Sequence, residues 1–139
     1  VCSSDLLTII ISLILILKDY IGVNLMDITI SVEKETNCSV VHVSGKIDAT
    51  TSDDLEDSLM ELLDQGEENI LLDLEGTHYL SSAGLRVLVA ITKQVYDSGH
   101  FGICNASDNV YEIIEMAGFN VFMNIYDDLA TAKEQISED

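Results

Sequence analysis

The chain has 139 residues, of which 47% are hydrophobic, and its 25 acidic and 6 basic residues give a formal net charge of −19. A chain of this length supports one hydrophobic core, so we expect one folded domain. The acidic excess argues against nucleic acid as a partner and disfavours an anionic membrane surface, because both are bound through Lys and Arg. The three cysteines are far apart and lack metal-ligand spacing, which favours a reducing, cytoplasmic location.

The first 25 residues differ from the rest. Residues 6–17 read LLTIIISLILIL, an apolar run shorter than the roughly 20 residues that span a bilayer. A signal peptide would need a basic region before this run and a small-residue cleavage site after it, and neither is present. Because residues 1–6 also read like a translated sequencing adapter, we predict that residues 1–25 are a non-native or disordered apolar extension and that the domain comprises residues 26–139. A short membrane-associating tail is the alternative.

Alternating apolar and polar residues predict two strands at the start of the domain. The first covers Ile28–Thr36 and the second Ser39–Ser44, with Gly45 as its end. Polar residues at positions 50–54 then favour a helix start, and leucines at positions 55, 59, 62 and 63 form an apolar stripe that ends before Gly66.

A nearly continuous apolar run predicts a buried central strand over Asn69–Leu74, followed by a loop. The order of elements is then β-β-α-β-α-β-α-β-α, which predicts an α/β fold: a mixed, mostly parallel sheet of about five strands with an N-terminal hairpin and about four helices. The remaining predicted elements are a helix over Ser82–Asp97, a strand over Phe101–Cys104, a helix over Asn109–Ala117 capped by Asp108, a strand over Val121–Ile125 and a helix over Asp127–Ser137.

The junction after the central strand is the most informative segment. Residues 79–88 read YLSSAGLRVL and join a strand to a helix through two serines. A serine at a helix start lies where backbone N–H groups lack partners and the helix dipole is positive, which is a favourable place for a phosphate. By spacing alone, a simple capping role for Ser81 or Ser82 explains the junction better.

Other chemistries fit the sequence less well. A nucleophile elbow needs Gly-x-Ser-x-Gly, and Leu80 occupies the first glycine position. The aspartates near the first helix lack the calcium-loop pattern, and the glycines form no nucleotide-binding fingerprint. We therefore predict no catalytic residue, no metal and no cofactor. The three histidines, His42, His78 and His100, have no recognisable acid partner in the sequence order of a catalytic triad. His42 lies within a predicted strand, where we expect an ordinary residue whose hydrogen bonds are satisfied.

From about Asp27 to its end, the chain resembles a STAS domain of the anti-sigma factor antagonist kind. The most specific likeness is in residues 70–74 (ILLDL) running into residues 79–88. Two further segments support it, namely residues 44–51 (SGKIDATT) and the pattern of residues 109–119 (NVYEIIEMAGF).

The resemblance implies a non-enzymatic switch. Such a domain, when unphosphorylated, binds an anti-sigma factor that is also a serine kinase of the histidine-kinase-like ATPase type. The kinase phosphorylates the serine matched by Ser82, and a metal-dependent phosphatase reverses this. Ser81 stands where many members have Asp and is a secondary candidate acceptor. The implied partner-binding residues are Asp48, Thr50, Ser81, Ala83, Gly84 and Arg86.

A second function remains open from the sequence. STAS modules also occur in membrane transport systems for lipids or anions, where the domain serves as a regulatory or interaction unit. The apolar residues 6–17 would favour this alternative if they belong to the natural protein.

Overall fold

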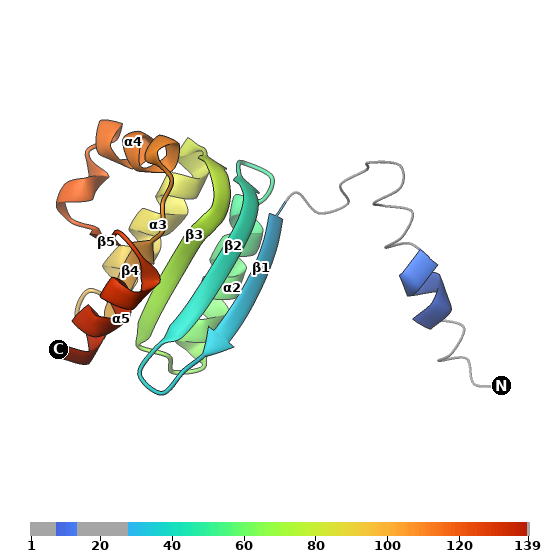
Figure 1. Ribbon diagram of the computed structural model, residues 1–139, viewed down its shortest axis with the longest axis horizontal. Coiled ribbons are helices and arrows are strands. Elements are labelled where there is room, and N and C mark those ends of the chain that lie inside the picture. The colour runs from blue at the N-terminus through green and yellow to red at the C-terminus, as the bar shows by residue number, and fades with distance from the viewer. Residues whose placement is uncertain (1–7, 14–27, 139) are drawn as a thin grey trace.

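The structure is a computed structural model that describes residues 8–13 and 28–138 (Figure 1). Residues 28–138 form a five-stranded sheet with helices on both faces, in the predicted order of elements. These elements are β1 (Ile28–Lys34), β2 (Ser39–Ile47), α2 (Ser52–Asp64), β3 (Asn69–Leu80), α3 (Ser82–Val95), β4 (His100–Cys104), α4 (Asp108–Met116), the 3₁₀ helix η1 (Phe119–Val121), β5 (Asn124–Tyr126) and α5 (Leu129–Glu138).

The sheet has the strand order β1-β2-β3-β4-β5. Strand β1 pairs with β2 in antiparallel fashion, and each later pair is parallel. This arrangement confirms the predicted α/β fold with its N-terminal hairpin. Strand β3 is central, and its residues 70–74 are all buried, as the apolar run in the sequence predicted.

The core lies on both faces of the sheet. Successive side chains of a strand point to opposite faces, so Leu72 packs toward the helices α2 and α3 while Leu71 packs toward α5 (Figure 1). Cys38 and Cys104 are buried, free thiols in the smaller cluster under α5. Burial raises the pKa of the Cys104 thiol to about 12, so it stays protonated and acts as a small apolar residue.

Two strand ends were predicted wrongly, and both errors matter for the site. Strand β2 continues through Gly45 to Ile47, and the segment after Leu74, expected to be a loop, continues β3 to Leu80. The register between the strands shifts around Gly45, which adopts a positive φ of 114°. The buried Thr77 hydroxyl donates to the backbone carbonyl of Val43 across 2.9 Å. Pairing between β2 and β3 therefore extends both strands beyond the residues at which their apolar sequence patterns end.

Smaller differences concern helix and strand boundaries. The cap of α4 is Ser107, whose hydroxyl accepts the N–H of Val110 at 3.2 Å, whereas Asp108, the predicted cap, is the first helical residue. The predicted final strand begins instead as the 3₁₀ helix η1, and only its end, from Asn124, pairs with β4.

Of the predicted extension, residues 1–25, only residues 8–13 are described, and they form a short helix with exposed side chains. The predicted start at Met26 lies outside the described residues. Within residues 8–13 and 28–138, no helix has the length and apolar character that crossing a bilayer requires.

Candidate functional site

Two loops that are far apart in sequence meet at one edge of the sheet. Strands β2 and β3 are parallel and end at paired residues, Ile47 and Leu80. Just beyond this pair, the backbone N–H of Ser81 donates to the carbonyl of Ile47 at 2.8 Å. The segment before α2 and the segment that starts α3 are therefore tied to each other directly. The structure brings the two predicted halves of the site together.

The start of α3 gives its two serines different roles. Ser81 is the N-cap: its hydroxyl accepts the N–H of Gly84 at 3.3 Å, and its carbonyl accepts the N–H of Leu85 at 2.9 Å. Ser82 is the first helical residue and is exposed. The capping explanation therefore applies to Ser81, while the hydroxyl of Ser82 lies on an exposed residue at the positive end of the helix dipole.

Gly84 is buried and allows α3 to approach the sheet closely. A Cβ at this position would lie 2.6 Å from Ile47 Cγ2 and 2.6 Å from Leu80 Cδ1, and both of these side chains are fully buried. The structure thus gives Gly84 a packing role, because it holds the first turn of α3 against the paired strand ends.

Asp48 organises the loop between β2 and α2. Its Oδ1 atom accepts the backbone N–H groups of Thr50 (2.9 Å) and Thr51 (3.1 Å), and the Thr50 hydroxyl at 2.7 Å. The bond from the Thr50 hydroxyl, with those backbone bonds, lowers the pKa of the Asp48 carboxyl. Thr51 further fixes the loop by donating from its hydroxyl to the Lys46 carbonyl at 2.7 Å. One carboxylate oxygen of Asp48 is therefore engaged within its own loop.

The other predicted residues lie on or near the surface around this junction. Thr50 and Arg86 are exposed, and Ala83 is half-buried. Arg86 is four residues after Ser82, so the two lie on the same side of α3, one turn apart.

Sequence reasoning did not select two exposed neighbours of the site. Lys46 and Tyr79 are cross-strand partners, one residue before the Ile47–Leu80 pair, and Tyr79 is 43% exposed. Lys46 lies in the resembling segment 44–51, but its closeness to Tyr79 follows only from the β2–β3 register. Arg86, one turn after Ser82, is one of the six basic residues of a strongly acidic chain.

His42 forms the predicted satisfied strand contact, and it has two acid partners that the sequence did not reveal. Its Nδ1 atom lies 2.7 Å from Asp73 Oδ2 and its Nε2 atom 3.1 Å from Glu33 Oε2. Asp73 is buried and also accepts from the Asn105 amide at 3.0 Å and the Glu75 N–H at 3.0 Å. Among the described residues, no serine hydroxyl or cysteine thiol is hydrogen-bonded to His42, so this group does not complete a nucleophilic triad.

The pKa values of His42 and Asp73 are both shifted from their ordinary values. The Glu33 hydrogen bond raises the pKa of His42, aided by Asp73 and opposed by partial burial. Burial raises the pKa of Asp73, but the bonds from Asn105, Glu75 and His42 outweigh it and leave that pKa below its ordinary value. In the part of the chain that is described, no cluster of three or more His, Cys, Asp and Glu side chains is arranged to hold a metal ion.

Comparison with known proteins places this geometry in a family. The family model of the STAS domain matches residues 29–132. BtrV of Bordetella bronchiseptica, whose name assigns it provisionally to the anti-sigma factor antagonists, is 31% identical over 91 residues, covering 65% of this chain and 78% of that protein. The anti-sigma F factor antagonist of Paenibacillus polymyxa is 26% identical over 113 residues, covering 80% of this chain and 97% of that protein.

A solved structure is similar as well. The crystal structure of an anti-sigma factor antagonist from Mycobacterium paratuberculosis superposes with a TM-score of 0.75 at 27% sequence identity, and the match covers 79% of this chain and 94% of that one.

Proposed function

Because this chain belongs to the STAS domain family of anti-sigma factor antagonists, we propose that it is a non-catalytic, cytoplasmic protein-binding switch. In its unphosphorylated form it binds an anti-sigma factor that is also a serine kinase of the histidine-kinase-like ATPase type. Phosphorylation of Ser82 by that kinase releases it, and a metal-dependent serine phosphatase restores the binding form.

The exposure of Ser82 is the observation that carries this proposal. An acceptor serine must reach the active site of a kinase, and Ser82 is exposed at the first position of α3. Ser81, the secondary candidate, is half-buried, and its hydroxyl already caps the helix. The geometry therefore supports Ser82 as the main acceptor.

The residues around Ser82 support a binding surface. We assign partner contacts to the exposed Thr50 and Arg86 and to the half-buried Ala83, which lie on both sides of the Ile47–Ser81 junction. In this proposal, Asp48 and Gly84 contribute by holding the two loops in place, and Ser81 contributes as the helix cap. No catalytic group is needed, since the phosphoryl transfer is performed by the kinase.

A phosphate at Ser82 would change binding more than folding. It adds about −1.5 to −2 charges and three acceptor oxygens. The helix N-terminus and Arg86, one turn away, favour that charge in the free domain. In a desolvated interface the same charge is costly. To change the ratio of bound to unbound protein from 1:99 to 99:1, the binding free energies of the phosphorylated and unphosphorylated forms must differ by about 5.5 kcal/mol.

The test is a phosphorylation assay with a serine kinase of the histidine-kinase-like ATPase type from the same organism. Intact-mass spectrometry after incubation with ATP should show one added phosphate on the wild type and none on Ser82→Ala. Ser81→Ala should still be modified. Ser98→Ala, which changes an exposed serine beyond the far end of α3, is the matched control and should behave as wild type.

Binding is measured separately. We expect phosphorylated protein and Ser82→Asp to lose most of their affinity for the kinase in calorimetry, with an unchanged circular dichroism spectrum. Unchanged affinity in both would show that charge at Ser82 is not the switch.

The alternative function is a STAS module of a membrane transport system for lipids or anions. The fold by itself fits both functions, since one fold can serve many roles. The antagonist names of the related proteins favour the first. Copurification with a transporter, together with no phosphorylation by the ATPase, would support the alternative.

A further inference from the structure

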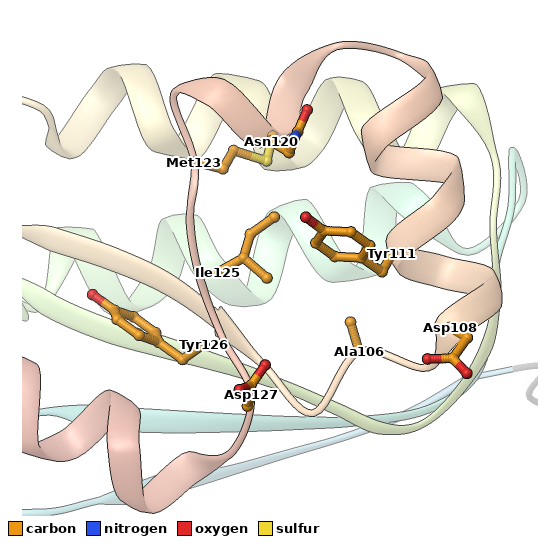
Figure 2. A pocket seen from close by; sticks show the side chains of 8 residues that line it. All are labelled: Ala106, Asp108, Tyr111, Asn120, Met123, Ile125, Tyr126 and Asp127. Atoms are coloured by element: carbon orange, nitrogen blue, oxygen red, sulfur yellow. The ribbon is translucent and has the colours of Figure 1, made fainter.

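A cavity lies apart from the Ser82 junction, between α4 and the strand β5 (Figure 2). Its volume is about 380 Å³, within the range of roughly 300–1,000 Å³ typical of small-molecule sites. It opens beyond the carboxyl ends of the parallel strands β4 and β5, where open α/β sheets commonly bind ligands. Its lining residues are Ala106, Asp108, Tyr111, Asn120, Met123, Ile125, Tyr126 and Asp127.

Two polar side chains in this cavity have unused hydrogen-bonding capacity. Figure 2 shows Tyr111 extending from α4 toward Ile125, with its hydroxyl leading, and Asn120 on the side of the cavity opposite the two aspartates. Within residues 8–13 and 28–138, neither the Tyr111 hydroxyl nor the Asn120 amide has a hydrogen-bond partner. Tyr126 differs, since its hydroxyl is bonded to His100 Nε2 at 2.9 Å.

The charge of the lining selects for a cation. Asp108 and Asp127 are both exposed at the cavity, and no Lys or Arg is among its lining residues. The whole chain carries a net charge of −19, so an anion would be repelled locally and at long range. The face of an aromatic ring, here Tyr111, attracts ammonium groups. The apolar Met123 and Ile125 supply a surface for carbon atoms.

We propose that this cavity binds a small organic cation, a protonated or quaternary amine. Its charged nitrogen is held by Asp108, Asp127 and the Tyr111 ring, and its carbon atoms pack on Met123 and Ile125. Asn120 and the Tyr111 hydroxyl bind a polar substituent of the ligand. The same chemistry is offered by a free amine and by the basic side chain of a bound protein. This proposal is independent of phosphorylation at Ser82.

The test is an NMR titration of the isotope-labelled 139-residue chain with three probes. Choline represents a free amine, N-acetyl-lysine amide represents a protein side chain, and sodium chloride at equal ionic strength is the control. We expect saturable shifts of the backbone amides of Asp108, Tyr111, Asn120 and Asp127 with choline, with the lysine derivative, or with both. Binding of choline identifies a free amine as the ligand class, and binding of the lysine derivative alone identifies a partner side chain.

Variants make the test specific. Asp108→Asn combined with Asp127→Asn should weaken the affinity by about tenfold, because two attractive charges are removed. Asp53→Asn combined with Asp57→Asn removes two exposed charges on α2 and should leave the affinity unchanged. Tyr111→Leu should also weaken binding, and the spectrum of each variant reports whether it is folded. Shifts that sodium chloride reproduces, or equal losses in both double variants, would overturn the proposal.

Discussion

At the scale of single residues, the two adjacent serines show that identical side chains take different roles when their positions in a helix start differ. Ser81 uses its hydroxyl to cap α3, and Ser82, one residue later, is exposed. The cap satisfies one of the free N–H groups of the first turn, that of Gly84, so the proposed modification of Ser82 would leave the cap in place. Glycine at position 84 is required by the same turn, because it lies against two buried side chains.

Gly84→Ala should destabilise the protein. The added methyl group would lie 2.6 Å from side-chain atoms of Ile47 and Leu80, which are buried and cannot move into solvent. Overpacking of this kind costs about 1–3 kcal/mol, partly offset by up to about 1 kcal/mol of helix propensity. We expect a net loss of about 1 kcal/mol in urea unfolding. Ser82→Ala, in the same turn, should change stability by less than about 0.5 kcal/mol, and equal stability of both variants would contradict the packing argument.

Substitutions at Asp48 test whether this residue acts by organising its loop. Asp48→Ala removes the acceptor of the Thr50 and Thr51 backbone N–H groups, so amide hydrogen exchange in residues 50–52 should accelerate and partner affinity should fall. Asp48→Asn keeps a side-chain oxygen that accepts the same bonds and should retain most of the affinity. If Asp48→Asn is as defective as Asp48→Ala, the negative charge itself contacts the partner.

At the scale of elements, strands β1, β2 and β3 are linked by side chains as well as by backbone pairing. His42 of β2 contacts Glu33 of β1 and Asp73 of β3 through its two ring nitrogens. A neutral imidazole donates from one nitrogen only, so two carboxylate partners favour the charged, doubly protonated ring. The raised pKa of His42 and the lowered pKa of Asp73 agree with this assignment.

The contribution of this ion group to stability should depend on pH. The pKa of His42 is raised in the folded state, so the stabilisation that His42 provides is fully present below about pH 6.5, the ordinary pKa of histidine. This stabilisation is lost as the pH rises through the folded-state pKa. The lowered pKa of Asp73 adds stability above about pH 4, which is lost as the pH falls through its folded-state value. The group should therefore contribute most between about pH 4 and 6.5.

Urea unfolding of the wild type and His42→Gln, at about pH 5.5 and about pH 8.5, measures this contribution below and above the ordinary pKa of histidine. We expect the free-energy difference between the two proteins to be larger at the lower pH. A difference that is independent of pH would show that the pKa of His42 is the same in the folded and the unfolded protein, and a smaller difference at the lower pH would show that His42 is neutral in the folded protein.

At the scale of the whole molecule, the dominant feature is the net charge of −19. Like charges on one folded domain repel one another and destabilise the compact state. The described ion pairs of Lys34 and Lys133 are at the surface, so they offset little of this repulsion.

Added salt should therefore stabilise the protein. Raising the ionic strength from about 0.01 M to 0.15 M shortens the Debye length from about 30 Å to about 8 Å, which screens repulsion between distant acidic side chains more than it weakens close pairs. We expect the melting temperature in sodium chloride to rise, as followed by circular dichroism. A lower melting temperature at the higher salt concentration would mean that attractive surface pairs outweigh the repulsion.

Much of the architecture could be predicted from the sequence because it depends on local patterns. Alternation in Ile28–Lys34, the apolar run 70–74 and the leucine spacing in α2 each reflect the periodicity of one element. Together they identify the order of strands and helices and the mixed sheet. The strand-serine-helix junction could be found in the same way, since a cap and its following apolar stripe are neighbours in the chain.

Only the tertiary structure decided how those elements complete the site. The extensions of β2 past Gly45 and of β3 past Leu74 depend on the register between two strands, which no local period encodes. The same register places Ile47 beside Leu80 and, through the 2.8 Å bond to Ser81, joins the two loops. His42 and Asp73 are 31 residues apart in the chain. Contacts at such separations arise from the packing of the whole sheet, so they become visible only in the folded molecule.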